Sequence, residues 1–190
     1  MKKQFWMAMC MGLGLALATT GAVAQEMGGM KMEMPANAKK PLSPPAKAEV
    51  TVAGAAISID YSAPSVRGRV IFGGLVPWGQ VWRTGANAAT TLKTSAGLKI
   101  GDLAVPAGTY TLYTLPTETG WTLIVNKQTG QWGTEYDAKQ DFGRVALKKS
   151  QLADKVETMV LVFEKTKGNT TELHLKWADL DLSVPVTVTK

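Results

Sequence analysis

Apolar and polar residues alternate along most of the chain from residue 46 onward, and this period of two predicts β-strands. Val50 and Val52 alternate with other residues, and so do Ile57, Ile59 and Tyr61. Further strand-like runs follow at residues 90–94, 109–115, 121–125, 145–147, 156–164, 170–177 and 184–188. The run at 156–164 is apolar on both faces, which predicts a central strand.

Turn signals rich in glycine separate these runs at intervals of roughly ten residues. Short strands at this spacing are typical of sandwiches and barrels, and we expect an all-β fold, an antiparallel β-sandwich. One short helix is expected at residues 150–154, where Ser150 is placed to cap the first turn.

Residues 62–89 interrupt the alternation and are expected to form a long loop rich in glycine and proline. Three of the four arginines lie in it, at Arg67, Arg69 and Arg83, and tryptophans lie beside them. A connection of this length inside a domain usually serves a function. Arginine offers a planar fork for carboxylate or phosphate and stacks on aromatic rings, so we expect a small oxygen-rich ligand or a protein partner at this loop.

The candidate binding residues combine cationic, hydroxyl and amide groups with aromatic surfaces. They are Arg67, Arg69, Trp82, Arg83, Thr84 and Asn87, with Tyr110 or Trp132 as stacking surfaces. A noncatalytic binding module is the leading functional hypothesis. In the structural alternative, the arginines pair with carboxylates such as Asp60 or Asp141 and pin the loop, while the tryptophans fill the core.

The first 24 residues have the three-part pattern of a cleavable signal peptide. Lys2 and Lys3 precede an apolar run at residues 5–18, and the small residues Ala22 and Ala24 frame a cleavage site. An uncleaved membrane anchor is the alternative, but a spanning helix needs about 20 apolar residues. We therefore expect a periplasmic or secreted protein that has no membrane partner after cleavage.

The composition narrows the classes of partner. The chain has 21 basic and 15 acidic residues, and losing Lys2 and Lys3 lowers its net charge from +6 to +4. The basic residues are scattered, so no nucleic-acid partner is expected. The single cysteine, Cys10, lies in the signal peptide, and we expect the single histidine, His174, to face solvent on a strand. Neither a zinc site nor a cofactor is expected from these counts.

Residues 25–45 are expected to be a disordered tether, followed by a single domain at residues 46–190. The tether contains prolines and four methionines, Met27, Met30, Met32 and Met34. Thioether sulfur is a soft donor that suits Cu(I), so copper handling is an alternative function. No histidine or cysteine supports such a site in the tether.

An exported hydrolase that acts on a glycan-like substrate is a further alternative. Such an enzyme needs two carboxyl groups across a cleft, and the candidates are Asp60, Asp102, Glu135, Asp137 and Asp141. The chain contains neither a G-x-S-x-G motif nor a P-loop motif. Both absences argue against a serine hydrolase of the common kind and against a nucleotide-binding loop.

Three runs resemble those of a known bacterial family. They are PSVRGRVIFGGLVPWGQVWRTGANAAT at residues 64–90, PAGTYTLYTLP at 106–116 and WTLIVNK at 121–127. They are similar to the bacterial domain-of-unknown-function 2911 family, and the resemblance covers about residues 43–186. It implies an exported, single-domain, β-rich protein and no established activity. Family members often carry glutamate where this chain has Ala88, so an activity that needed that carboxylate would be absent here.

Overall fold

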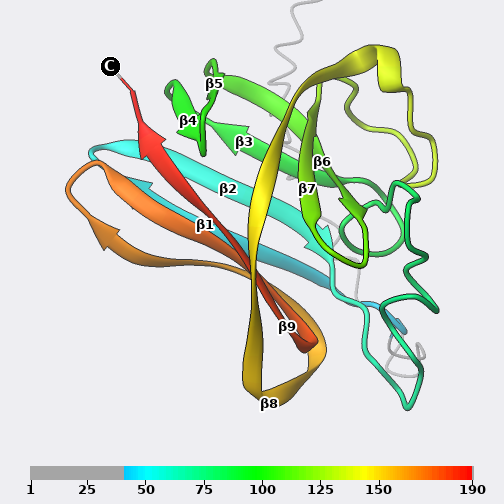
Figure 1. Cartoon of the computed structure of the whole chain (residues 1–190). Helices are drawn as coiled ribbons and strands as arrows, with labels where there is room; N and C mark the ends of the chain where they lie inside the picture. Colours follow the sequence, from blue (N-terminus) through cyan, green and yellow to red (C-terminus); the bar gives the residue numbers. More distant parts are fainter. Residues whose placement is uncertain (1–40, 190) are drawn as a thin grey trace, which may run out of the picture. The chain divides into compact units, whose positions relative to one another are not determined.

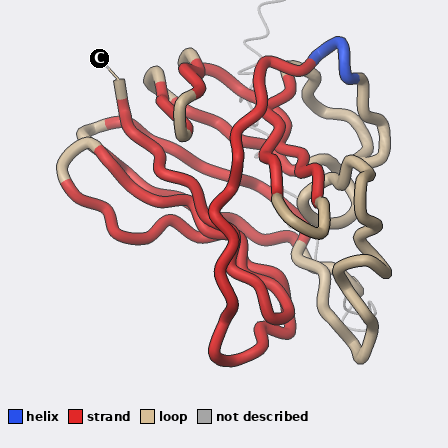
Figure 2. Tube along the Cα trace, in the orientation of Figure 1, coloured by secondary structure: helices blue, strands red, loops and turns tan. Residues whose placement is uncertain are grey.

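The computed structural model describes residues 41–189, which are built almost entirely of antiparallel strands (Figure 1 and Figure 2). The strands in chain order are β1 (Pro45–Val52), β2 (Ala55–Ser62), β3 (Thr90–Thr94), β4 (Leu98–Ile100), β5 (Leu103–Val105), β6 (Gly108–Pro116), β7 (Trp121–Asn126), β8 (Asp141–Lys167) and β9 (Thr170–Val188). The one helical element within these residues is a 3₁₀ turn at Ala138–Gln140. The expected all-β fold is confirmed.

The strands follow one another in the order β1-β2-β3-β6-β7-β8-β9-β4-β5, and each neighbouring pair is antiparallel. The alternation in β2 buries Ile57, Ile59 and Tyr61 in one apolar core with residues of β8 and β9. The backbone N–H of Leu161 in β8 donates to the Tyr61 hydroxyl at 3.1 Å, which ties the two sides of this core together. The arrangement is sandwich-like, as expected.

The two long strands β8 and β9 are bent. β8 pairs with β7 through its first residues and with β9 on both sides of an irregular stretch between Gln151 and Val156. β9 reverses direction near Ala178, whose φ is 51° (Figure 1). Because of this reversal, the backbone N–H of Val188 at the end of β9 donates to the carbonyl of Asn169, which precedes its start, at 2.8 Å.

The prediction of a helix at residues 150–154 is wrong, because these residues belong to β8. Ser150 pairs with Asp181 and Gln151 pairs with Leu180, both in β9. The Ser150 hydroxyl donates to the carbonyl of Asp181 at 3.2 Å instead of capping a helix. Pairing with a distant strand has overridden the local capping signal.

Four of the six tryptophans join Phe72 in an aromatic cluster, which consists of Phe72, Trp78, Trp82, Trp121 and Trp177. Phe72 meets Trp121 and Trp177 edge-on, with ring centroids 5.2 and 6.1 Å apart. Trp82 stacks on Trp177 at 5.7 Å with an interplanar angle of 15°. The cluster therefore fastens the loop residues onto β7 and β9.

Residues 63–89 form the expected long connection between β2 and β3, called loop 63–89 below. At its start, the N–H of Val66 donates to the carbonyl of Glu157 in β8 at 2.8 Å. Near its end, Trp82 and Thr114 of β6 exchange two backbone hydrogen bonds of 2.7 and 2.8 Å. The loop is thus fixed to two different strands, with the aromatic cluster between the two attachments.

Some sequence predictions lie outside the described residues. They concern the signal peptide at 1–24, most of the tether and the four methionines proposed for copper, Met27, Met30, Met32 and Met34. Within residues 41–189, no helix has the length and apolar character needed to cross a membrane.

Candidate functional site

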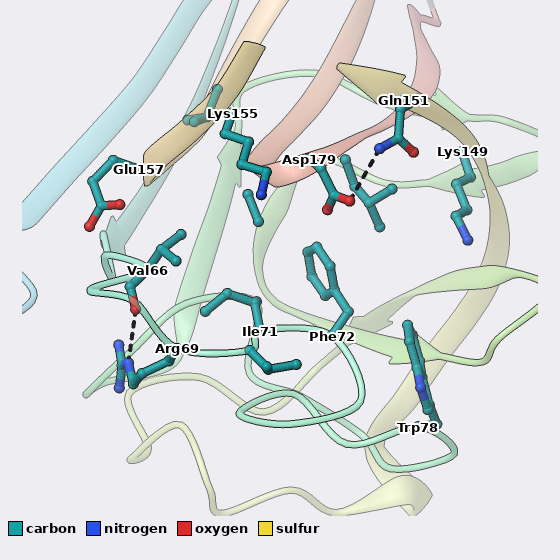
Figure 3. A pocket seen from close by; sticks show the side chains of 14 residues that line it. Val66, Arg69, Ile71, Phe72, Trp78, Lys149, Gln151, Lys155, Glu157 and Asp179 are labelled. Carbon is teal, nitrogen blue, oxygen red and sulfur yellow. Dashed lines mark hydrogen bonds between the residues drawn. The ribbon is translucent and has the colours of Figure 1, made fainter. Parts of the chain in front are cut away.

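An open cleft of about 540 Å³ lies between loop 63–89 and the bent parts of β8 and β9 (Figure 3). Loop residues form one wall and strand residues form the other. The lining residues are Val66, Arg69, Val70, Ile71, Phe72 and Trp78 from the loop, and Lys149, Gln151, Lys155, Val156, Glu157, Ala178, Asp179 and Leu180 from the strands.

The loop wall of the cleft is largely apolar and aromatic. Phe72 and Trp78 stack with ring centroids 6.4 Å apart, and both belong to the aromatic cluster. Gly73 permits this packing, since its φ is 79° and a side-chain carbon there would lie 2.6 Å from the indole nitrogen of Trp78. Val70, which is 74% exposed, adds apolar surface to the same wall.

The strand wall of the cleft is polar. β8 contributes Lys149 and Gln151, which precede its irregular stretch, and Lys155 within it, and the reversal of β9 contributes Asp179 (Figure 3). The Gln151 amide donates to a carboxylate oxygen of Asp179 at 3.1 Å, which holds the two strands together at the wall. The cleft therefore depends on two backbone irregularities in neighbouring strands.

Three cationic side chains line the cleft. The Arg69 guanidinium donates to the carbonyls of Ser65 and Val66, at 2.6 and 3.1 Å, so its position is set by its own loop. Within residues 41–189, Lys149 and Lys155 form no ion pair. Ammonium groups facing an aromatic wall suit an anion that carries an apolar face.

Among the eight predicted binding residues, Arg69 is the one that lines this cleft. Arg67 lies on the neighbouring surface, where its guanidinium donates to the carbonyl of Leu42. The backbone of Arg67 has a φ of 51°, and its N–H donates to the Glu157 carboxylate at 2.8 Å. The loop therefore separates the two arginines, although one residue lies between them in the sequence.

Three of the predicted residues are taken up by packing, Thr84 and Tyr110 in the interior and Trp82 partly buried against the core. Trp82 belongs to the aromatic cluster, and Thr84 is 1% exposed with a φ of 54°, a strained value for a β-branched residue. Tyr110 is also buried, and its hydroxyl donates to the carbonyl of Pro106 at 3.1 Å. The packing of Trp82 agrees with the alternative in which the tryptophans of the loop pack against the core instead of binding a ligand.

The remaining three predicted residues, Arg83, Asn87 and Trp132, are brought together away from the cleft. The N–H of Gly133 donates to the carbonyl of Asn87 at 3.0 Å, and Ala88 forms a β-bridge with Trp132. The side chain of Arg83 crosses Gly133 so closely that a side-chain carbon there would overlap it. Loop 63–89 thus contributes to two separate surface regions.

The prediction that His174 faces solvent is wrong, because the residue is only 4% exposed. Its Nδ1 lies 2.9 Å from Asp181, and its Nε2 lies 3.2 Å from Glu172 and 3.7 Å from Glu164. Asp181 reaches the ring because β9 reverses direction. A hydrogen bond from Lys165 lowers the pKa of Glu172, and its contact with His174 acts in the same direction.

The carboxylates considered for hydrolysis lie away from the cleft. Asp60 pairs with Lys93 at 3.0 Å, and Asp141 pairs with Arg144 at 2.8 Å, so neither pins an arginine of loop 63–89. Tyr136 donates to Asp141 at 2.7 Å. Burial and then this hydrogen bond raise the pKa of Tyr136. None of the five candidate carboxylates lines the cleft.

Sequence reasoning missed the polar wall of the cleft. Lys149, Gln151 and Lys155 lie in or beside the segment expected to be a helix, and Asp179 had no distinguishing neighbours in the sequence. The spacing of polar residues around 149–155 was the only available signal, and it does not indicate which segment lies opposite. In residues 41–189, no set of histidine, cysteine, aspartate and glutamate side chains is arranged to hold a metal ion.

Comparison with known proteins gives one result for this chain. The family model described as "Protein of unknown function (DUF2911)" matches residues 43–186, which includes both walls of the cleft. No curated protein and no solved structure is detectably similar to the chain.

Proposed function

Because the chain belongs to the family described as "Protein of unknown function (DUF2911)", whose description names no activity, we propose its function from the cleft. The protein is a noncatalytic binding module for a small anionic ligand that has an apolar face. The observation that carries this proposal is the position of Lys149 and Lys155 opposite Phe72 and Trp78.

The chemistry of the two walls supports this ligand class. A carboxylate, sulfonate or phosphate on the strand wall accepts charge-assisted hydrogen bonds from the ammonium groups, each worth about 1.5–3 kcal/mol. An apolar or aromatic body on the loop wall removes the surface of Phe72 and Val70 from water. The hydrogen bond between Gln151 and Asp179 leaves a second amide N–H and a carboxylate oxygen for polar groups of the ligand.

Binding of naphthoate tests the proposal, because this planar carboxylate combines both features, and its uncharged amide, naphthamide, is the matched comparison. Isothermal titration should show naphthoate binding and at least tenfold weaker binding of naphthamide. Lys155→Gln should weaken naphthoate binding about tenfold, the loss of one charge-assisted hydrogen bond. Lys139→Gln is the control, since Lys139 is an exposed lysine of the 3₁₀ turn.

The proposal is overturned if naphthoate and naphthamide bind equally, or if Lys155→Gln and Lys139→Gln both bind naphthoate as the unaltered protein does. Thermal unfolding of each variant without ligand shows whether the fold is intact. Lys155 has no ion pair within the described residues, so its replacement is expected to leave the melting temperature within about 2 °C.

A glycan hydrolase is the second candidate, because the carboxylates of Glu157 and Asp179 line the same cleft. Paired carboxyl groups in a groove are what glycoside hydrolysis requires. Release of reducing ends from polysaccharides is the assay, and activity should disappear in both Glu157→Gln and Asp179→Asn. Activity retained by both variants would remove this candidate.

We also propose that the module works in the periplasm or outside the cell. The charged, apolar and small-residue segments in residues 1–24 support this location. Mass spectrometry of the protein secreted by an expressing bacterium is expected to give a chain that begins at Gln25. A full-length mass in the cytoplasmic fraction alone would contradict the proposal.

A further inference from the structure

Arg83 carries a charge that no described residue compensates. The residue is half-buried, and its Nε is buried without a hydrogen-bond partner. Among residues 41–189, the Arg83 side chain forms no ion pair, and its Nε has no hydrogen-bond partner. Buried polar groups are normally hydrogen-bonded, so a partly buried guanidinium whose Nε lacks a partner is suited to an anion from outside the described domain.

The position of Arg83 is set by its neighbours. Its Cβ and Cδ lie against Gly133, and an added side-chain carbon at Gly133 would be 3.0 Å from Arg83 Cβ. Gly133 is held in turn by its N–H, which donates to the carbonyl of Asn87. Asn87 has a φ of 58°, a left-handed conformation that asparagine tolerates better than most residues. The Cβ–Cδ part of the Arg83 side chain is therefore held in place by its contacts with Gly133, and the guanidinium extends from it.

An exposed tryptophan accompanies this arginine. Trp132 directly precedes Gly133 and is 51% exposed, whereas the four other described tryptophans belong to the aromatic cluster. The β-bridge between Ala88 and Trp132 fixes the backbone beneath its ring. A half-exposed indole beside a partly buried cation offers a flat apolar face and a positive charge on neighbouring segments.

We propose that Arg83 and Trp132 form a second binding site, which takes a carboxylated sugar such as a uronate unit. The sugar carboxylate pairs with the guanidinium, and one face of the pyranose ring lies on the indole. None of the residues of this site lines the cleft, so the site is independent of the proposed function. Charge complementarity selects an acid, and the flat ring of Trp132 selects a cyclic ligand over an open-chain one.

Titration of the protein with glucuronate tests this site, with glucose and glutarate as comparisons that lack either the carboxylate or the ring. Glucuronate should bind at least tenfold more tightly than either comparison. Arg83→Gln should weaken glucuronate binding about tenfold, and Trp132→Ala about three- to tenfold. Arg67→Gln, an arginine replacement outside both the cleft and this site, should leave glucuronate binding unchanged.

Each other outcome counts against the proposal. Equal binding of glucose excludes the role of the guanidinium, and equal binding of glutarate excludes the sugar. No glucuronate binding at all overturns the site. Because Arg83 packs on Gly133, Arg83→Gln can lower stability, so Trp132→Ala at its exposed position is the deciding variant. Unchanged glucuronate affinity in a folded Trp132→Ala protein refutes the proposal.

Discussion

Replacing Trp177 by alanine is expected to be among the most destabilising single substitutions in this domain. The residue is 0% exposed, stacks on Trp82 and meets Phe72 edge-on. Its indole N–H also donates to the carbonyl of Glu157 at 3.3 Å. Truncating a buried aromatic side chain to alanine costs about 3–5 kcal/mol, which includes the cavity left behind. The carbonyl of Glu157, which also accepts from Val66, keeps a partner.

Urea unfolding followed by circular dichroism measures this cost. We expect the unfolding midpoint of Trp177→Ala to fall with little change in the m-value, because the surface exposed on unfolding is nearly the same. Thermal unfolding should show a melting temperature lower by roughly 6–20 °C, at about 2–4 °C per kcal/mol for a domain of this size. Loop 63–89 should loosen as well, since Trp177 supports two of its aromatic residues.

The matched control is the same substitution at Trp132, which is half exposed and lies outside the aromatic cluster. Trp132→Ala is expected to change the free energy of unfolding by less than about 0.5 kcal/mol. If Trp177→Ala lowers the free energy of unfolding by less than about 1 kcal/mol, the view that the aromatic cluster anchors loop 63–89 is refuted. Equal losses in both variants would refute it too.

Two further predictions concern close packing and pH. Gly133→Ala places a carbon that overlaps Arg83 and lies 2.7 Å from the carbonyl oxygen of Asn87, so it should lower the free energy of unfolding by about 1–3 kcal/mol. Gly120→Ala is the control, because the nearest neighbour of the added carbon is 3.8 Å away and the free energy of unfolding should change by less than about 0.5 kcal/mol. Similar melting temperatures of the two variants would contradict this prediction. The hydrogen bond from Lys176 lowers the pKa of Glu164 in the folded protein below its unfolded value of 4.5. The ionised carboxylate therefore stabilises the fold fully above pH 4.5, and this stabilisation is lost as the pH falls through the lower pKa of the folded protein. Urea unfolding of Glu164→Gln should therefore show a deficit of about 0.5–1 kcal/mol in the free energy of unfolding at neutral pH, and this deficit should shrink as the pH is lowered below 4.5. A deficit independent of pH would contradict the linkage.

The strands could be predicted because the alternation of apolar and polar residues is visible within each short segment of the sequence. The buried residues of β2 and β3 follow the period of two, and residues 90–94 coincide with β3. The short strands β4 and β5 have three residues each, too few for a period to emerge around Gly101. The helix expected at Ser150 failed for a different reason, because strand pairing with Asp181 is a contact that local patterns do not contain.

The candidate site was predictable on one wall only. The glycine- and proline-rich composition of residues 63–89 predicted the loop, and its Arg69 lines the cleft. The opposite wall depends on the reversal of β9 at Ala178, where a positive φ occurs without a glycine or proline to mark it in the sequence. The burial of His174 has the same origin, since Asp181 comes beside the ring only after the reversal.

The pairing of β4 with the end of β9 determines when the domain can be completed. β4 pairs with β5 and with residues 186–188 of β9, and Thr189 donates to the carbonyl of Gly97 at 2.8 Å. During synthesis at about 5–20 residues per second, β4 and β5 therefore wait about 4–17 s for their neighbour to emerge. Leu98 and Ile100, buried in the finished fold, lack their β9 partners Val188 and Val186 throughout that interval. A chain that ends a few residues early keeps this edge permanently open to association with other chains.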